Sequence, residues 1–181
     1  MTFEDELDIC LRSRFSLIVL VTVEEERALR TVADACRRTE RACLAWDVAD
    51  GFDAVANFRG SVPVAPDPKT ALEHVDRDEG STVFVLRDFH DLWTNAQVKR
   101  KLRGVVQRLK ATTKTVIVVT PSGKVPDELK DAAVVVEFPP PGVAELEAVL
   151  GRLTRSPDVT VNLTRLGREK LVQAALGLTA A

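Results

Sequence analysis

The stretch Phe15–Val23, with the sequence FSLIVLVTV, runs directly into Glu24-Glu25-Glu26, and this junction decides how the 181-residue chain is interpreted. A nearly continuous run of apolar, partly β-branched residues is typical of a strand buried on both faces of a parallel sheet. In one class of nucleotide-binding α/β proteins, the first such strand leads into the glycine-rich loop G-x-x-x-x-G-K-[ST], whose backbone N–H groups and lysine hold phosphates. No glycine occurs between Met1 and Asp50, and three carboxylates stand where that loop would be. We therefore expect a parallel sheet without a phosphate-binding loop.

A helix is predicted to follow this strand over residues 23–38. Its apolar residues recur at helical spacing, its acidic residues come first and its arginines last, as the helix macrodipole prefers. Thr22 and Glu25 have the spacing of a capping box. A helix N-terminus that is capped by its own side chains is not open to an anionic ligand, so the sequence predicts a closed phosphate position.

Further apolar runs alternate with helical patterns, which predicts an α/β fold with five parallel strands and right-handed crossovers. After the first strand, strands are expected at 42–48, 82–86, 114–120 and 133–138. A short helix precedes the first strand, and residues 57–68, with three prolines, are predicted to be a loop. Two more helices are expected, one at 67–75 with Asp67 as cap and Pro68 in first position, and one at 94–109 with Thr94 and Gln97 as a capping box.

The pattern changes after Pro139-Pro140-Pro141. Apolar residues at helical spacing predict one helix around 146–153 and another over 164–176, which Gly177 ends. Residues 159–163 fit only a short extended piece. The sequence thus predicts an α/β domain over 1–141 and a partial helical subdomain over 142–181.

Composition excludes several function classes. A net charge of −2 with 45% hydrophobic residues is ordinary for a globular protein, so neither a nucleic-acid nor a membrane partner is expected. The acidic N-terminus has no signal-peptide pattern. Three cysteines without a C-x-x-C pair favour reduced, buried thiols and a cytoplasmic location over metal binding or catalysis.

The segment from Val83 to Asp88 (VFVLRD) has the form of a Walker B strand, in which four hydrophobic residues precede two acids. In a working ATPase the first acid holds Mg²⁺ and the second polarises the attacking water. Arg87 replaces the first acid and places a positive charge at the metal position. Asp88 can still be a general base, although a strand-end carboxylate making local hydrogen bonds is the favoured interpretation.

Three other features invite a functional interpretation. Gly123-Lys124 lacks the remaining residues of a phosphate-binding loop, so a turn is favoured. The basic residues of the helix at 94–109 have no interleaved aromatic residues, which favours a solvated face over nucleic-acid contact. Phe89, His90 and Trp93 follow a strand at the sheet edge where open α/β sheets place function. They are either a partner-binding patch or side chains packed under the loops.

With the elements in this order, the chain resembles an AAA+ module. The segment from Phe138 to Leu146 resembles the junction between the fifth strand and the helical lid, and the segment from Gln173 to Thr179 is similar to a sequence segment of that lid. More narrowly, several phrases resemble the N-terminal, degenerate module of an AAA ATPase family found in cyanobacteria, red-algal plastids and other bacteria. These phrases are LDICLRSRF (7–15), TVEEER (22–27), ALEHV (71–75), FVLRDFH (84–90) and ALGLT (175–179).

The resemblance implies a strand order of 5-1-4-3-2 and a C-terminal lid fragment. It implies a non-hydrolysing first domain, with ATP and Mg²⁺ handled by a second AAA domain downstream and with an AAA ATPase domain or its oligomer as partner. The chain departs from the family pattern in lacking a phosphate-binding loop, a complete Walker B segment and an asparagine at the sensor position, where Thr120-Pro121 stands. It also lacks a clear arginine finger between Lys130 and Val134. Therefore no catalytic, cofactor-binding or metal-binding residue is carried over.

Three hypotheses follow from the sequence. The leading one is a catalytically inactive AAA-like module that makes assembly, regulatory or substrate contacts for an AAA ATPase. The second is a small Rossmann-like nucleotide or ligand binder, or an enzyme, that uses Asp88 and the strand ends. The third is a stand-alone interaction adaptor that binds through Phe89, His90 and Trp93. Because the sequence stops where a further lid helix would begin, it is interpreted as a fragment or a stand-alone remnant.

Overall fold

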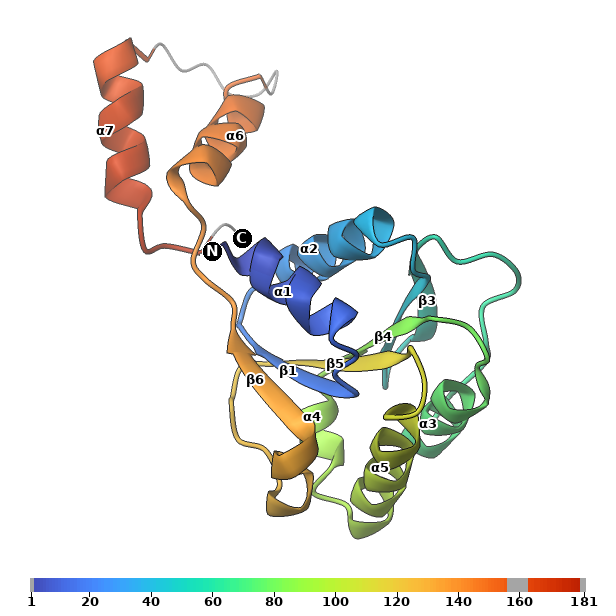
Figure 1. Ribbon diagram of the computed structural model, residues 1–181. Coiled ribbons are helices and arrows are strands. Elements are labelled where there is room, and N and C mark those ends of the chain that lie inside the picture. Colours follow the sequence, from blue (N-terminus) through green and yellow to red (C-terminus); the bar gives the residue numbers. More distant parts are fainter. Residues whose placement is uncertain (1, 156–162, 180–181) are drawn as a thin grey trace. The chain divides into compact units, whose positions relative to one another are not determined.

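The computed structural model describes residues 2–155 and 163–179, and Figure 1 shows the path of the chain. The chain divides into two compact units, residues 1–138 and residues 139–181. No helix in the described ranges is both long enough and apolar enough to cross a lipid bilayer.

The first unit is built on a six-stranded sheet with the order β3-β2-β4-β5-β1-β6. Five of its strands are parallel and match the predicted ones in identity and in order: β1 (Leu17–Val21), β2 (Cys43–Asp47), β4 (Val83–Arg87), β5 (Thr115–Thr120) and β6 (Ala133–Glu137). Strand β1 is bonded to β5 and to the edge strand β6, so that Val19 aligns with Val118 on one side and with Val135 on the other.

The prediction of five purely parallel strands was wrong, because β3 (Gly51–Ala56) adds an antiparallel edge strand beside β2. A tight turn makes this hairpin. Asp47 Oδ1 accepts hydrogen bonds from the backbone N–H groups of Ala49 and Asp50 at 2.9 and 2.8 Å, and Gly51 has a φ of +76°. Only Phe52 and Ala56 of β3 are buried, so the strand has no continuous apolar run to reveal it.

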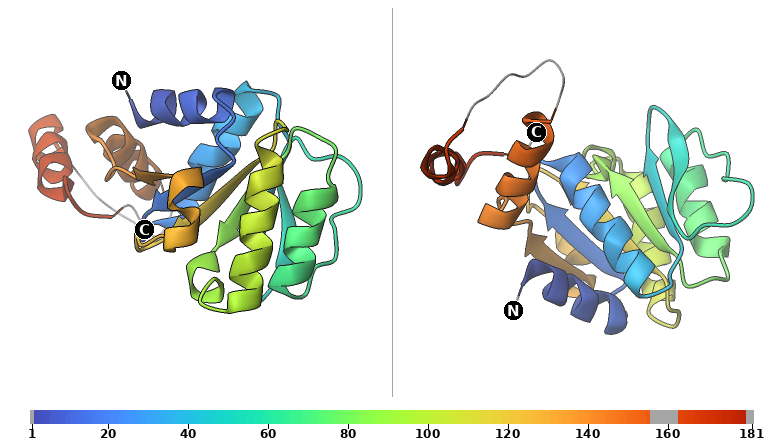
Figure 2. Two further views of the ribbon diagram at one scale, coloured as in Figure 1. Left: turned by 60° about the horizontal axis from the view of Figure 1, so that its bottom comes forward. Right: turned by 90° about the horizontal axis from the view of Figure 1, so that it is seen from above.

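Helices cover both faces of the sheet (Figures 1 and 2). One face carries α1 (Phe3–Arg12) and α2 (Glu25–Arg38), and the other carries α3 (Pro68–Arg77) and α5 (Ala96–Leu109). Successive residues of a strand point to opposite faces, and accordingly Leu17 and Val19 belong to one hydrophobic core while Ile18 and Leu20 belong to the other. Two short elements complete the unit, α4 (Phe89–Leu92) and the 3₁₀ helix η1 (Asp127–Ala132).

The helix caps were predicted with mixed success. Asp67 caps α3 as expected, accepting from the N–H groups of Lys69 and Thr70, with Pro68 in the first position. The cap of α5 is Asn95 and not Thr94, because the Asn95 side chain accepts from the first-turn N–H groups while the Thr94 hydroxyl donates back to Asp91 O.

The capping box expected at Thr22 and Glu25 does not form. The helix α2 begins at Glu25, and the Thr22 hydroxyl accepts a 2.9 Å hydrogen bond from Glu24 N instead. Thr22 therefore supports the turn before the helix and not the helix itself.

The second unit consists of two helices in its described part, α6 (Val143–Leu153) and α7 (Arg165–Ala175). Leu146, Leu150 and Val172 form its apolar contact, and Arg168 Nη2 donates to Glu147 O at 3.0 Å. Thr164 caps α7 by accepting from Gly167 N. Most of the short extended piece expected at 159–163 lies outside the described residues.

Candidate functional site

The carboxyl ends of the parallel strands form the edge at which open α/β sheets usually bind ligands. A cavity of about 310 Å³ lies there between the ends of β1, β4 and β5. Its lining residues are Thr22, Val23, Glu25, Asp88, Val119, Thr120 and Pro121. Two carboxylates and no cationic side chain line the cavity in the part of the chain that the structure describes, so this edge is an unfavourable place for a phosphate.

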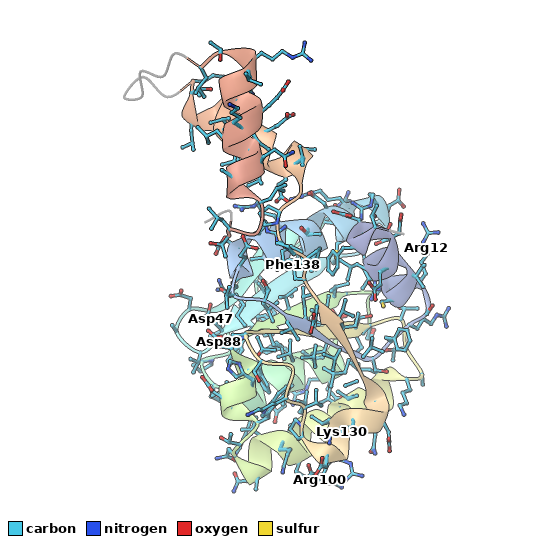
Figure 3. All side chains as sticks on the ribbon, turned by 90° about the vertical axis from the view of Figure 1, so that its left-hand side faces the viewer. Arg12, Asp47, Asp88, Arg100, Lys130 and Phe138 are labelled. Atoms are coloured by element: carbon cyan, nitrogen blue, oxygen red, sulfur yellow. The ribbon has the colours of Figure 1, made fainter. Side chains whose placement is uncertain are left out.

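Arg87, the last residue of β4, lies beside this cavity and holds two acidic side chains. Its guanidinium forms an ion pair with Asp47, and its Nη1 lies 3.4 Å from Glu25 Oε1. The sheet register explains the first contact, because Trp46 aligns with Leu86 and so places Asp47 next to Arg87. Figure 3 labels Asp47 and Asp88 at this edge of the sheet. The position expected for a metal ion is thus occupied by a cation of the chain itself.

The charge on Glu25 is disfavoured in this setting. Burial raises the pKa of Glu25, and the negative charges of Asp88 and Glu26 raise this pKa further, whereas the guanidinium of Arg87 acts in the opposite direction. The balance remains on the raised side. An additional anion here would meet the same unfavourable field.

A second ion pair lies at the start of α2. Arg27 Nη2 is 2.7 Å from Glu24 Oε2, and both side chains are more than nine-tenths buried. The guanidinium carbon of Arg27 also lies 4.0 Å from the ring centroid of Phe138, which is cation–π geometry. Sequence reasoning missed Arg27 and Asp47, although the Glu24–Arg27 spacing of three residues was a signal for the first pair.

Asp88 is held in a left-handed conformation with a φ of +50° at the start of α4. Its backbone N donates to Val119 O at 3.2 Å, which ties the strand end to β5. Its carboxylate is mostly exposed and lies 4.0 Å from His90 Nδ1. This geometry agrees with the interpretation of Asp88 as a strand-end residue with local contacts.

The aromatic residues after β4 are largely buried. Phe89 is 0% exposed and Trp93 is 5% exposed, because α4 turns both rings into the core beneath the sheet edge. Phe89 packs edge to face on Trp46. The expected patch of Phe89, His90 and Trp93 is therefore not an exposed aromatic surface, and His90 alone of the three is only half-buried.

The remaining sequence features fall into ordinary structure. Gly123-Lys124 lies in the irregular loop between β5 and η1, where Lys124 N donates to Ser122 Oγ. Three basic residues of α5 make ion pairs: Lys99 with Glu128, Lys101 with Glu73 and Arg108 with Asp76. All three cysteines are free and buried, and no cluster of three or more potential metal ligands occurs within the described residues.

Comparison with known families decides the family of the chain. Residues 3–138 match the model of the family described as SpoVK-like AAA ATPase, N-terminal domain. The chain belongs to this family. The expected resemblance to the N-terminal module of a cyanobacterial and plastid-type AAA ATPase family is confirmed by the family model and by algal relatives. The AAA domain-containing protein ycf46 of Trieres chinensis is 31% identical over 99% of this chain and 36% of its own length, and that of Guillardia theta is 29% identical over 99% and 35%. The chain thus spans about a third of the length of these relatives.

Solved structures share the fold at low sequence identity. The FIGL-1 AAA domain in complex with ADP superimposes with a TM-score of 0.57 at 11% identity, covering 92% of this chain and 56% of that one. A chain of the E. coli MS115-1 HORMA:CdnC:Trip13 complex is also similar, with a TM-score of 0.55 at 16% identity, covering 93% of this chain and 61% of that one. These likenesses establish an α/β fold of the AAA+ type.

Proposed function

We propose that this chain is a non-hydrolysing AAA-like domain that makes assembly, regulatory or substrate contacts for an AAA ATPase. The observation that carries the proposal is the ion-pair triad of Arg87 with Asp47 and Glu25 at the carboxyl edge of the sheet. A Mg²⁺ ion would require oxygen ligands and several waters at this place. The guanidinium of Arg87 repels such an ion and already pairs with Asp47 and Glu25, two of the carboxylates that could bind it.

The start of α2, where the phosphates of a nucleotide would lie, also supports the proposal. The start of α2 carries Glu24, Glu25 and Glu26, and the Glu24 carboxylate is bound to Arg27 within the chain. Phosphate sites commonly use the positive N-terminal end of a helix, and the acidic side chains at the start of α2 make this end unfavourable for nucleotide phosphates. Neither half of a Mg-ATP site is therefore supported by the side chains at this edge.

The role in a larger ATPase rests on the family. The family model is that of an N-terminal domain, and the chain matches about a third of the length of its ycf46 relatives. ATP and Mg²⁺ then belong to another AAA domain of the parent protein, and this domain or its oligomer is the expected partner. A protein partner is also in keeping with the fold, because one structure of similar fold is that of a complex of Trip13 with other proteins. Reduced, buried thiols fit a cytoplasmic setting.

Calorimetric titration with Mg-ATP tests the absence of a nucleotide site. We expect no binding at the carboxyl edge. A dissociation constant tighter than about 100 μM, which corresponds to roughly 5.5 kcal/mol, would contradict the proposal if it persists in the variant Arg12→Gln/Arg14→Gln. Those two arginines lie at the opposite edge of the sheet, so the variant separates the two ends of the molecule.

The partner role is tested by adding the purified chain to the remainder of a ycf46 relative that carries the intact AAA domain. We expect a complex by light scattering and a change in the ATPase rate of that domain. The second unit, which includes α6 and α7, is proposed to be a lid fragment that takes part in this contact. An unchanged hydrolysis rate together with the absence of a complex would refute the role.

A further inference from the structure

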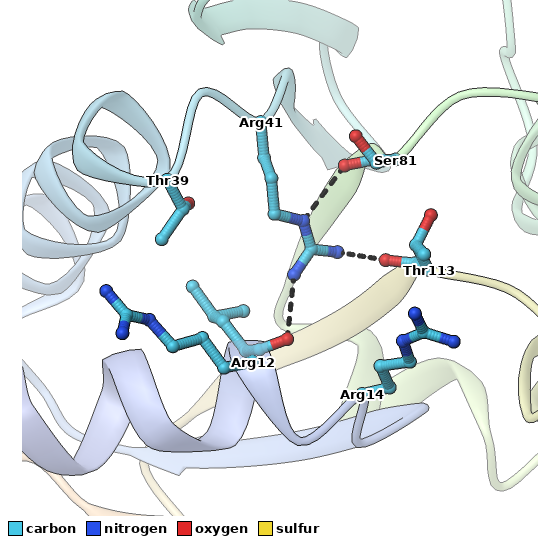
Figure 4. A pocket seen from close by; sticks show the side chains of 7 residues that line it. Arg12, Arg14, Thr39, Arg41, Ser81 and Thr113 are labelled. Atoms are coloured by element: carbon cyan, nitrogen blue, oxygen red, sulfur yellow. Dashed lines mark hydrogen bonds between the residues drawn. The ribbon is translucent and has the colours of Figure 1, made fainter.

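A basic cavity of about 390 Å³ lies at the amino edge of the sheet, opposite the edge expected for nucleotide chemistry (Figure 4). It is bordered by the segments that lead into four strands: Arg14 precedes β1, Arg41 precedes β2, Ser81 precedes β4 and Thr113 precedes β5. Arg12, at the end of α1, also lines it. The cavity thus brings together three arginines that the sequence separates by up to 29 residues.

Arg41 is the centre of this cavity and is 8% exposed. Its guanidinium donates to three backbone carbonyls, those of Leu11 at 3.3 Å, Ser81 at 2.9 Å and Thr113 at 2.5 Å, and to Thr115 Oγ1 at 3.2 Å. These bonds fix the position of the guanidinium, and Figure 4 draws the three that go to backbone carbonyls. They supply partial charges only, and a buried cation is normally balanced by a full negative charge.

No carboxylate balances the three arginines within the described part of the chain. The structure gives none of them an ion pair there, and the lining residues include no aspartate or glutamate. Glu40, the neighbour of Arg41, lines a different cavity with Arg37 and Asn57. Burial lowers the pKa of Arg41, so an anion beside it would restore the stability of its charged form.

The ends of α1 and α2 meet the same cavity and contribute some negative charge. Each helix C-terminus carries roughly half an elementary charge, so two of them offset about one of the three positive charges. Helices α3 and α5 also end at this edge, shortly before Ser81 and Thr113, so a net charge of roughly +1 to +2 remains. Arg12 and Arg14 are exposed, and in Figure 4 their side chains lie on opposite sides of the Arg41 guanidinium.

We propose that this cavity binds the phosphate group of a small polyanionic molecule. Guanidinium groups bind phosphate through paired, charge-assisted hydrogen bonds. Four of the five N–H donors of Arg41 are already bonded within the chain, so Arg41 contributes its positive charge and one N–H, and the paired contacts come from Arg12 and Arg14 at the surface.

Titration with sodium pyrophosphate at constant ionic strength tests the proposal, and the readout is calorimetry. Because loss of Arg41 would remove fold-stabilising hydrogen bonds, the test variant is Arg12→Gln/Arg14→Gln. We expect this variant to bind pyrophosphate at least about tenfold more weakly than the wild type, since it loses two charge-assisted contacts. The matched control is Arg100→Gln/Arg103→Gln on α5, which removes the same charge elsewhere and should change the affinity less than about twofold.

Each outcome has a definite meaning. Equal affinity of the wild type and Arg12→Gln/Arg14→Gln, or an equal loss in the α5 control, would overturn the site, because binding would then follow overall charge. Citrate is titrated as a carboxylate probe, and citrate binding as tight as that of pyrophosphate would overturn the phosphate assignment. No heat with any probe would likewise refute the proposal. These results leave the proposed function of the opposite edge untouched.

Discussion

The rings of Trp46 and Phe89 meet edge to face, with centroids 5.8 Å apart and planes inclined by 62°, and neither ring is exposed. Trp46 belongs to β2, whereas Phe89 opens α4 directly after β4. The contact therefore packs the loop after β4 against its neighbouring strand. Trp93 joins the same core from the end of α4. The carboxyl edge of the sheet is thus built on packed aromatic side chains, which gives it a rigid base.

Trp93→Ala should lower the free energy of unfolding by about 3–5 kcal/mol, because the substitution leaves a large cavity in a packed core. Chemical denaturation measures the effect. The control is Val64→Ala at a side chain that is 83% exposed, where a change within about 0.5 kcal/mol is expected. A loss for Trp93→Ala no larger than that of the control would show that this ring is a surface group and would revive it as a partner contact.

Trp46→Phe tests the anchor of the loop between β3 and α3. The indole Nε1 of Trp46 donates a buried 2.9 Å hydrogen bond to Ala65 O, and its loss leaves that carbonyl unpaired at a cost of about 1–3 kcal/mol. The released loop should also be cleaved faster by trypsin at Arg59. Trp93→Phe is the matched control, since the structure records no hydrogen bond from that indole among the described residues. Comparable losses in the two variants would mean that ring size, and not the hydrogen bond, anchors the loop.

Glu25→Gln tests the electrostatic environment at the carboxyl edge through the dependence of protein stability on pH. The pKa of Glu25 is raised above 4.5, chiefly by burial. The native state therefore holds more protons than the unfolded state just above pH 4.5, and stability falls as pH rises through this window. Glutamine has no such dependence, so Glu25→Gln should become more stable than the wild type as pH rises from about 4 to 7.

The control for this experiment is Asp67, whose ionisation makes stability depend on pH in the opposite direction. Hydrogen bonds from Thr70 lower the pKa of Asp67 below 3.8, so its contribution to stability is present above that value and is lost as pH falls. Asp67→Asn should therefore be less stable than the wild type at neutral pH, and the difference in stability should disappear as pH falls into the acid range. If Glu25→Gln is instead less stable than the wild type at pH 7, the ion pair with Arg87 outweighs burial and the charge balance described for this edge is incorrect.

Much of the fold is encoded in short stretches of sequence. The buried parallel strands have continuous apolar runs, such as LIVLV in β1, because both of their faces are covered. The cap of α3 was likewise predictable, since Asp67 and Pro68 act on the nearest backbone groups. The order of the five parallel strands came from the family resemblance, and the structure agrees with it.

Other features depend on residues that meet only in the folded chain. The edge strand β3 has no distinctive pattern, because its pairing comes from the turn after Asp47 and from one exposed face. The burial of Trp93 depends on how α4 folds back beneath the sheet. No local pattern of hydrophobicity records either event.

The two charge clusters illustrate the same division. The sequence alone shows that Arg87 replaces an acid and that no phosphate-binding loop follows β1. Only the sheet register brings Asp47 to Arg87, and only the convergence of four strand entries places Arg41 beside Arg12 and Arg14. Local propensity acts over a few residues, whereas these charges are joined by strand pairing and crossover geometry over tens of residues. The tertiary structure therefore decided which charges neutralise one another and which remain open to a ligand.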